Sequence, residues 1–312
     1  MMDILPLFYY PSTWIYTDDD KTLLKCMTAV FEEYNNVKSF QSSKVCLDFL
    51  VKNQSPLSKY NFLKSIFNDE SYGRLQHTPI DFDVTMLASL VNDPNRHNEI
   101  TALVIDYNMP EMDGFSLAQA CRHLPMCKLL LTGTAQDSQV ILGFNKSLIH
   151  RFVQKSQVDM EDTLISYLKE SSFLYFQKIS APLLSYLETE SQLPLSDPVF
   201  INFFKKYCEQ QNINEYYLID KQGSFLCLNK QGHRSCLIVH SDRSIDSWLL
   251  AYGVEDELPS DELLMVKNRK KIPFFGIGKE AWEFNPTDWP NYFYTPHVLQ
   301  GRERYFWAVL NL

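Results

Sequence analysis

The sequence lacks the features of membrane-spanning, secreted and nucleic-acid-binding proteins. No uninterrupted apolar run approaches the roughly 20 residues of a membrane helix. The formal net charge is -9, so the chain lacks the positive surplus that holds nucleic acid or an acidic membrane. The first residues, Met-Met-Asp-Ile-Leu-Pro-Leu, contain no basic region and no cleavage site, and we therefore expect no signal peptide there.

The cysteines are few and unpatterned. There are seven, an odd number, and none are spaced as Cys-x-x-Cys. This argues against a disulfide framework and against a four-cysteine zinc site. We expect reduced, mostly buried thiols in a cytoplasmic protein.

What the sequence does contain is typical of a globular protein. At 312 residues it is long enough for two domains, and it is 45% apolar and 21% charged with no low-complexity tract. Its first half alternates short apolar runs with segments of helical spacing, which predicts a doubly wound, five-stranded parallel sheet with right-handed crossovers. The expected strands are Trp14–Thr17, Val37–Gln41, Ile100–Ile105, Lys128–Leu131 and Arg151–Gln154, and the expected helices are Lys21–Tyr34, Ser43–Lys52, Ser116–Leu124, Asp137–Asn145 and Met160–Lys169.

The segment Ile100–Gly114 is the most informative one. A buried, β-rich run ends at Asp106, and a proline and a glycine follow within eight residues. A lone aspartate at a strand end is often only a turn residue or a helix cap. However, the carboxyl ends of parallel strands are also where such sheets place their ligand sites.

Other polar residues follow the neighbouring strands. Asp18 and Asp19 come after the first strand, Thr132 ends the fourth and Lys155 follows the fifth. The next acid, Asp20, is expected to cap the following helix. Three carboxylates at one edge would repel one another, and Mg2+, which prefers oxygen ligands, would relieve that repulsion.

This set resembles the receiver domain of two-component response regulators. The match rests on Asp18-Asp19, on Asp106-Tyr-Asn-Met-Pro-Glu-Met-Asp-Gly114, on Leu131-Thr132-Gly133 and on Phe152-Val-Gln-Lys155, and it covers roughly residues 11–170. The resemblance implies a flavodoxin-like fold.

The resemblance also implies roles for these residues. Asp106 would accept a phosphoryl group from a sensor histidine kinase or a phosphotransfer protein. Asp19, Asp106 and the backbone carbonyl of Asn108 would hold Mg2+ directly, and Asp18 would act mainly through a metal-bound water. Thr132 and Lys155 would contact the phosphoryl oxygens. A switch would couple the movement of Thr132 to that of Phe152, the aromatic residue three positions before the lysine.

The sequence departs from this family in three ways. Ser156 stands where the family usually has a proline, often after a cis bond, and the non-proline residue favours a trans bond. Residues 53–98 form an insertion, in which we expect helices at Tyr60–Phe67 and Asp83–Val91. Thr134 and Asn108 flank the path of a hydrolytic water and would tune the lifetime of the phosphoryl group.

The second half predicts a different architecture. We divide the chain into a receiver domain (1–170), a helical linker (171–196) and an output domain (197–312). Two Lys-Gln-Gly turns between apolar runs indicate hairpins, so we expect an α+β domain with an antiparallel sheet. It looks somewhat like a sensor domain of the PAS kind, and like an uncharacterised output module found after receivers. Neither resemblance names an activity.

No separate enzymatic motif and no helix-turn-helix is evident in the output domain, and DNA binding is not expected. His233, His240 and His297, with Asp242, could form a metal set, but scattered histidines are the preferred interpretation. The aromatic residues could line a pocket, but core packing is the preferred interpretation for them: Trp282, Trp289, Tyr292, Phe293 and Tyr294.

The leading functional hypothesis is a phosphorylation-switched regulator whose output domain acts through protein contacts, on an unknown protein target or in a homodimer. Its own chemistry would then be limited to accepting and losing the phosphoryl group. One alternative is a degenerate receiver that serves as a constitutive interaction module. The other is a C-terminal sensor of a small ligand.

Overall fold

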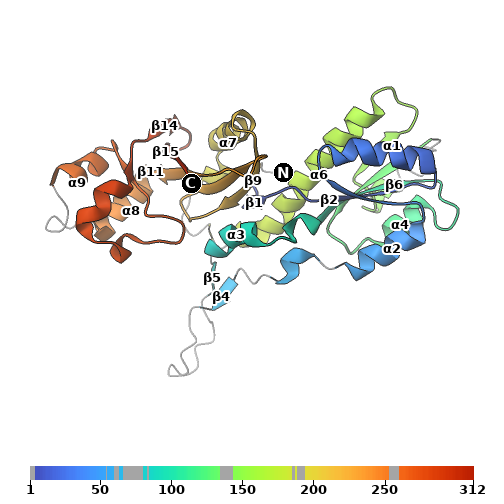
Figure 1. Ribbon diagram of the computed structural model, residues 1–312, viewed down its shortest axis with the longest axis horizontal. Helices are drawn as coiled ribbons and strands as arrows, with labels where there is room; N and C mark the ends of the chain where they lie inside the picture. Colours follow the sequence, from blue (N-terminus) through green and yellow to red (C-terminus); the bar gives the residue numbers. More distant parts are fainter. Residues whose placement is uncertain are drawn as a thin grey trace, which may run out of the picture. The chain divides into compact units, whose positions relative to one another are not determined.

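The computed structural model describes residues 4–53, 55–59, 63–65, 80–82, 84–133, 143–184, 187, 194–252 and 260–312. The chain forms two compact units, each assembled from separate stretches of sequence (Figure 1). Unit 1 comprises Met1–Tyr9, Asn61–Asn92 and Ser180–Leu312, and unit 2 comprises Tyr10–Tyr60 and Asp93–Ile179.

Unit 2 contains a five-stranded sheet in the order β3-β2-β6-β7-β8, and every neighbouring pair is parallel. The strands are β2 (Thr13–Thr17), β3 (Asn36–Phe40), β6 (Ile100–Asp106), β7 (Cys127–Thr132) and β8 (Arg151–Gln154). The helices are α1 (Lys21–Glu32), α2 (Ser43–Lys52), α4 (Gly114–Ala120) and α6 (Met160–Leu184). The predicted parallel sheet is confirmed. The helix expected at Asp137–Asn145 lies mostly outside the described residues.

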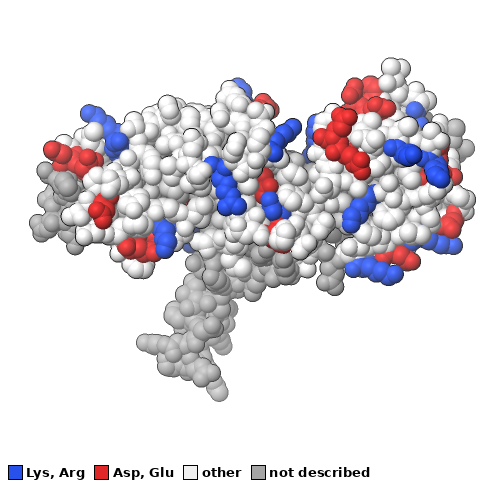
Figure 2. Space-filling model, viewed as in Figure 1, with Lys and Arg blue, Asp and Glu red and all other residues white. Residues whose placement is uncertain are grey.

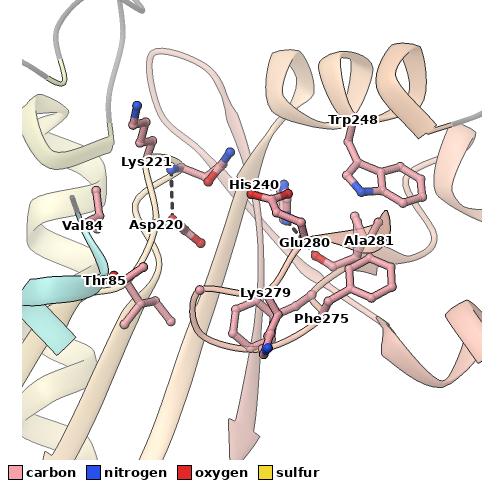
Figure 3. A pocket seen from close by; sticks show the side chains of 16 residues that line it. Val84, Thr85, Asp220, Lys221, His240, Trp248, Phe275, Lys279, Glu280 and Ala281 are labelled. Carbon is pink, nitrogen blue, oxygen red and sulfur yellow. Dashed lines mark hydrogen bonds between the residues drawn. The ribbon is translucent and has the colours of Figure 1, made fainter. Parts of the chain in front are cut away.

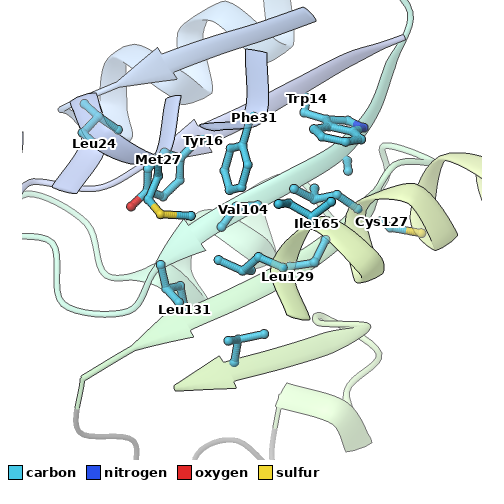
Figure 4. Close-up of a cluster of buried hydrophobic side chains, with 14 residues drawn as sticks. Trp14, Tyr16, Leu24, Met27, Phe31, Val104, Cys127, Leu129, Leu131 and Ile165 are labelled. Atoms are coloured by element: carbon cyan, nitrogen blue, oxygen red, sulfur yellow. The ribbon is translucent and has the colours of Figure 1, made fainter. Parts of the chain in front are cut away.

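Two apolar clusters pack on opposite faces of this sheet. One joins strand residues such as Tyr16 and Val104 to α1 and α6, through Phe31 and Leu164 among others (Figure 4). The other joins the opposite face to α2 and α4. The sheet is therefore doubly wound, with its strands buried on both faces as the continuous apolar runs predict.

Helix α6 differs from the expectation of two helices separated near residue 170. It is continuous from Met160 to Leu184, and Pro182 lies in its last turn. No helix breaker stands at the expected gap. The Ser172 hydroxyl is buried and makes hydrogen bonds inside the unit. It accepts a hydrogen bond from Trp14 Nε1 at 2.8 Å and lies 2.9 Å from Thr101 Oγ1. Because its hydroxyl has partners there, Ser172 is compatible with the helix interior.

Unit 1 contains a six-stranded sheet in the order β1-β9-β10-β11-β15-β14, with every neighbouring pair antiparallel. Its strands are β1 (Phe8–Tyr9), β9 (Ile213–Leu218), β10 (Phe225–Asn229), β11 (Arg234–Ser241), β14 (His297–Gln300) and β15 (Arg304–Asn311). The helices are α3 (Thr85–Ser89), α7 (Pro198–Gln210), α8 (Asp242–Tyr252) and α9 (Ser260–Lys267), and β12 (Ile272–Pro273) pairs with β13 (Phe293–Tyr294). The predicted α+β architecture is confirmed, but the edge strand β1 was not foreseen.

The insertion is less helical than predicted. Leu63–Ser65 is the strand β4, paired with β5 (Ile80–Phe82), so the helix expected at Tyr60–Phe67 is wrong where it is described. Ile80-Asp81-Phe82 alternates apolar and polar residues, as a strand does, and such short runs do not separate helix from strand by sequence alone. The second expected helix is present as α3, continued by a 3-10 turn at Leu90–Asn92. Helix α3 packs against β9, and the insertion thereby contributes to unit 1.

Among the described residues, no helix combines the length and the apolarity needed to cross a membrane.

Candidate functional site

Three carboxylates meet at the C-terminal edge of the parallel sheet in unit 2. Asp18 follows β2, and Asp106 is the last residue of β6. One side-chain oxygen each from Asp18, Asp19 and Asp106 lie within 4.8 Å of one another. Asp18 and Asp106 are buried and Asp19 is exposed, so the cluster is open to solvent on one side. The three acids were expected at this edge, because parallel strands end together.

Asp18 is held by three donors. The Tyr16 hydroxyl donates to Oδ2 at 2.8 Å, and the Asp20 backbone N–H donates to Oδ1 at 2.9 Å. The ammonium of Lys155 lies 2.8 Å from Oδ2. The sequence analysis missed Tyr16. A usable signal existed, since residues two apart on a strand share a face of the sheet.

Lys155 joins the two buried acids. Its Nζ lies 2.9 Å from Asp106 Oδ1 as well as beside Asp18, and its backbone N–H donates to the Thr132 carbonyl at 2.8 Å. The described residues contain no cis peptide bond, and the bond before Ser156 is trans, as that residue favours. Lys155 reaches both carboxylates with this trans bond.

The charges shift one another's pKa values. Burial raises the pKa of Asp106, Lys155 opposes this increase, and the charges of Asp18 and Asp19 add to it. Burial alone would lower the pKa of Lys155, but its hydrogen bonds to Asp18 and Asp106 outweigh that effect and raise it. The site is therefore short of positive charge, and an added cation would stabilise the ionised acids.

The segment after Asp106 turns tightly into α4. Gly114 N–H donates to the Tyr107 carbonyl at 2.9 Å, and the Asp113 carboxylate caps α4 by accepting from Ser116 N–H at 2.7 Å. A Cβ on Gly114 would lie 2.6 Å from the Asp106 carbonyl oxygen. Only glycine lets α4 begin this close to the strand that carries Asp106.

Two of the remaining predicted residues, Thr132 and Asn108, lie at the same edge. Thr132 is buried at the end of β7, and Asn108 is exposed two residues beyond Asp106. Phe152 on β8 is half-buried and packs against the apolar cluster on the α2 and α4 face. Thr134 lies outside the described residues.

The donor set suits a hard divalent cation. Carboxylate and carbonyl oxygens are the ligands that Mg2+ prefers. Among the described residues, Asp18, Asp19 and Asp106 form a cluster whose oxygens lie close enough together to share a metal ion. The exposed Asp19 leaves room for the waters that Mg2+ usually keeps.

Among the described residues, His233, His240 and His297 do not join Asp242 in a cluster that could hold a metal ion. His240 Nε2 lies 2.9 Å from the Pro273 carbonyl oxygen and Nδ1 lies 3.1 Å from Ser244 Oγ. His297 stands against Trp307 with ring centroids 4.6 Å apart. Asp242 instead pairs with Arg269 and Arg304.

Most of the C-terminal aromatic residues singled out in the sequence belong to packed clusters. Trp289 and Phe293 are buried, and both rings contact Phe275. Trp282 is the exception, at 71% exposure. On the face shown in Figure 2, basic and acidic side chains are interspersed rather than gathered by sign.

The fold of the whole chain is similar to that of a solved response regulator. The chain is similar over its whole length to the Legionella pneumophila response regulator LqsR, with 26% identity, a TM-score of 0.80, and coverage of 100% of this chain and 91% of that one. The resemblance to response regulators is thereby confirmed.

Two further structures match only part of the chain. The receiver domain of Francisella response regulator 1452 matches at 18% identity and a TM-score of 0.34, covering 54% of this chain and 98% of that domain. A CheY-like receiver domain protein from Methanospirillum hungatei matches at 14% and 0.36, with coverage of 54% and 98%. No family model and no curated protein matches the sequence.

Proposed function

We propose that the chain is a phosphorylation-switched response regulator of a two-component phosphorelay. Asp106 accepts a phosphoryl group from a sensor histidine kinase or a phosphotransfer protein. The observation that carries this proposal is the meeting of Asp18, Asp19, Asp106 and Lys155 at one sheet edge. The full-length similarity to LqsR supports it.

The transfer needs a carboxylate nucleophile and positioned charge. A side-chain oxygen of Asp106 attacks the phosphorus of a phosphohistidine, and the P–N bond breaks as the P–O bond forms. The electron pair of that bond returns to the donor imidazole, which takes a proton from solvent. Phosphoryl transfer depends mostly on alignment and charge neutralisation, which a cluster of fixed side chains supplies.

Each of the other residues has a share in that neutralisation. Lys155, already 2.9 Å from Asp106 Oδ1, pairs with a phosphoryl oxygen, and the Thr132 hydroxyl donates to another. Asp19, Asp106 and the Asn108 backbone carbonyl would hold Mg2+, with Asp18 acting through a metal-bound water. The ion would supply positive charge to the phosphoryl oxygens.

The output is proposed to work through protein contacts. Phosphorylation moves Thr132 and Phe152, and it changes the surface around β7 and β8. In the proposed division, residues 1–170 form the receiver, 171–196 the linker and 197–312 the output domain, except that β1 and α3, which belong to unit 1, serve the output side. The formal net charge of -9 favours a protein target or a second copy over DNA.

Beryllofluoride, which stands in for the phosphoryl group, tests the switch. Hydrogen exchange and light scattering of the full chain would be compared with and without beryllofluoride and Mg2+. We expect altered exchange in peptides containing Thr132 and Phe152, with none in Asp106→Asn. Asp48→Asn, an exposed acid on α2, serves as the control and should behave as the wild type. An unchanged wild-type exchange pattern would contradict the proposed switch, and a change in mass would identify self-association as its output.

A further inference from the structure

Unit 1 contains a cavity of about 580 Å3 whose residues take no part in the site described above. This volume is within the range of small-molecule sites, roughly 300–1,000 Å3. Its walls come from the start of α3, the turn between β9 and β10, the end of β11, α8 and the segment 273–281 (Figure 3). The insertion thus supplies one wall, through Val84 and Thr85. This wall packs closely against the segment 273–281, because a Cβ added to Gly278 would lie 3.1 Å from Thr85 Cγ2.

A fixed carboxylate stands on one side of this cavity. Asp220 Oδ1 accepts hydrogen bonds from the backbone N–H groups of Gln222, Gly223 and Ser224, each at 2.9 Å. All three bonds fall on the same oxygen. Burial raises the pKa of Asp220, and the Ser224 hydroxyl and backbone groups oppose that increase. A positively charged partner would therefore stabilise the ionised form of this carboxylate.

Aromatic side chains stand on the other side. Figure 3 shows Trp248 and Phe275 across the cavity from Asp220 and Thr85, with His240 between them. The two rings are stacked with centroids 6.5 Å apart and an interplanar angle of 20°. Such faces favour flat apolar groups, and they attract cations.

The other polar groups of the cavity are already engaged or are exposed to solvent. His240 is hydrogen-bonded to Pro273 and Ser244, and burial lowers its pKa while the charge of Asp220 opposes that decrease. Lys279 has its ammonium 2.9 Å from Glu283, and Lys221 is exposed. Glu280, also exposed, adds a second carboxylate to the lining, and it accepts from the Tyr252 hydroxyl at 3.2 Å.

We propose that this cavity binds a small organic cation, with its ammonium group at Asp220 and its flat apolar body against Trp248 and Phe275. The proposal goes beyond the phosphoacceptor function and does not depend on it. The separation of acid from aromatic groups selects an elongated, amphipathic amine over a compact inorganic ion.

A matched set of probes tests the charge requirement on the full-length protein. Phenethylamine, tryptamine and benzyltrimethylammonium are the cationic probes, 2-phenylethanol is the neutral one and 3-phenylpropionate is the anion. We expect saturable binding of at least one cation by ligand-observed NMR and by the change in tryptophan fluorescence. The alcohol and the carboxylate should bind at least roughly tenfold more weakly than that cation, because neither carries the positive charge that is attracted to the Asp220 carboxylate. Equal binding of all three charge types, or no saturable binding of any cation, would overturn the proposal.

Variants test the location. Asp220→Asn keeps an oxygen for the three backbone N–H groups and removes the charge, so the turn should survive while cation affinity falls about tenfold or more. Asp261→Asn, an exposed acid of α9 that does not line the cavity, is the control and should leave affinity unchanged. Unchanged affinity in a folded Asp220→Asn protein would overturn the assignment. Should that variant misfold, Trp248→Ala provides the second test, with a similar loss expected.

Discussion

Lys155 Nζ lies 2.9 Å from Asp106 Oδ1, and the same ammonium lies 2.8 Å from Asp18 Oδ2. One cation thus bridges the expected phosphoacceptor and a buried acid from a different strand. Both acids are nearly inaccessible, with side-chain exposures of 4% and 0%. Lys155 therefore competes with any added cation for the charge of the site.

This competition gives a prediction for Lys155→Met. Removing the ammonium leaves more negative charge at the sheet edge, so Mg2+ should bind severalfold more tightly than in the wild type. The rate of phosphoryl transfer should fall, because a positive group facing the phosphoryl oxygens is lost. Titration with Mg2+, followed by tryptophan fluorescence, measures the first effect. Lys146→Met changes an exposed lysine and should match the wild type, and weaker Mg2+ binding in Lys155→Met would contradict the prediction.

Tyr16→Phe removes one donor from Asp18. A buried carboxylate that loses a hydrogen bond costs about 1–3 kcal/mol of unfolding free energy. We expect a loss in that range in urea denaturation, together with weaker Mg2+ binding, because Asp18 is no longer fixed from the strand side. Tyr34→Phe alters a tyrosine that is 46% exposed and should change stability by less than about 0.5 kcal/mol. Equal effects of the two changes would argue against a special role for Tyr16.

Gly114 and Gly133 form a natural pair for testing close approach. Alanine at Gly114 places Cβ 2.6 Å from the Asp106 carbonyl oxygen, whereas at Gly133 it meets nothing within 4 Å. We expect Gly114→Ala to destabilise unit 2 by roughly 1–3 kcal/mol and to slow phosphoryl transfer by displacing the strand end. Gly133→Ala should be nearly neutral in stability. Thermal unfolding of the two variants side by side decides the matter, and equal melting temperatures would refute the steric argument.

The raised pKa of Asp106 predicts how stability depends on pH. A carboxyl that binds its proton more tightly when folded makes the unfolding free energy fall as pH rises from its ordinary value of 3.8 through the raised folded value. Asp106→Asn should therefore be more stable than the wild type at neutral pH in the presence of a chelator. The gain should shrink as pH is lowered towards 3.8. Mg2+ should raise the melting temperature of the wild type more than that of Asp106→Asn.

Differential scanning calorimetry at several pH values measures this effect. Asp48→Asn is the matched control, because it removes an exposed charge from α2 and should show no such pH-dependent gain. A variant Asp106→Asn that is less stable than the wild type at neutral pH without Mg2+ would show that the bridge to Lys155 outweighs burial and repulsion.

The sequence predicted the parallel sheet and the residues at its edge because both follow from local patterns. Apolar runs that end in polar residues reveal strands buried on both faces, and parallel strands bring their ends together. Asp106 and Lys155 could thus be placed at one edge without coordinates. Tyr16 was within reach of the same argument, through the two-residue period of a strand.

The rest depended on long-range contacts that leave little local signal. Strand β1 has only two residues, and its partner β9 is some two hundred positions away, so no periodicity could reveal the pair. The short strand at Leu63–Ser65 is defined by its pairing with β5. The buried Glu99, which accepts from Ser55 Oγ and from the Tyr175 hydroxyl, was equally invisible because its partners come from distant segments.

The most direct test of the central proposal is the intact mass of the protein after incubation with acetyl phosphate and Mg2+. One added phosphoryl group increases the mass by about 80 Da. We predict this increase in the wild type and in Asp48→Asn, its absence in Asp106→Asn, and its loss from the wild type when Mg2+ is chelated beforehand. A wild type that shows no increase, with Mg2+ present and the protein folded, would contradict the proposal and favour a receiver that acts as a constitutive interaction module.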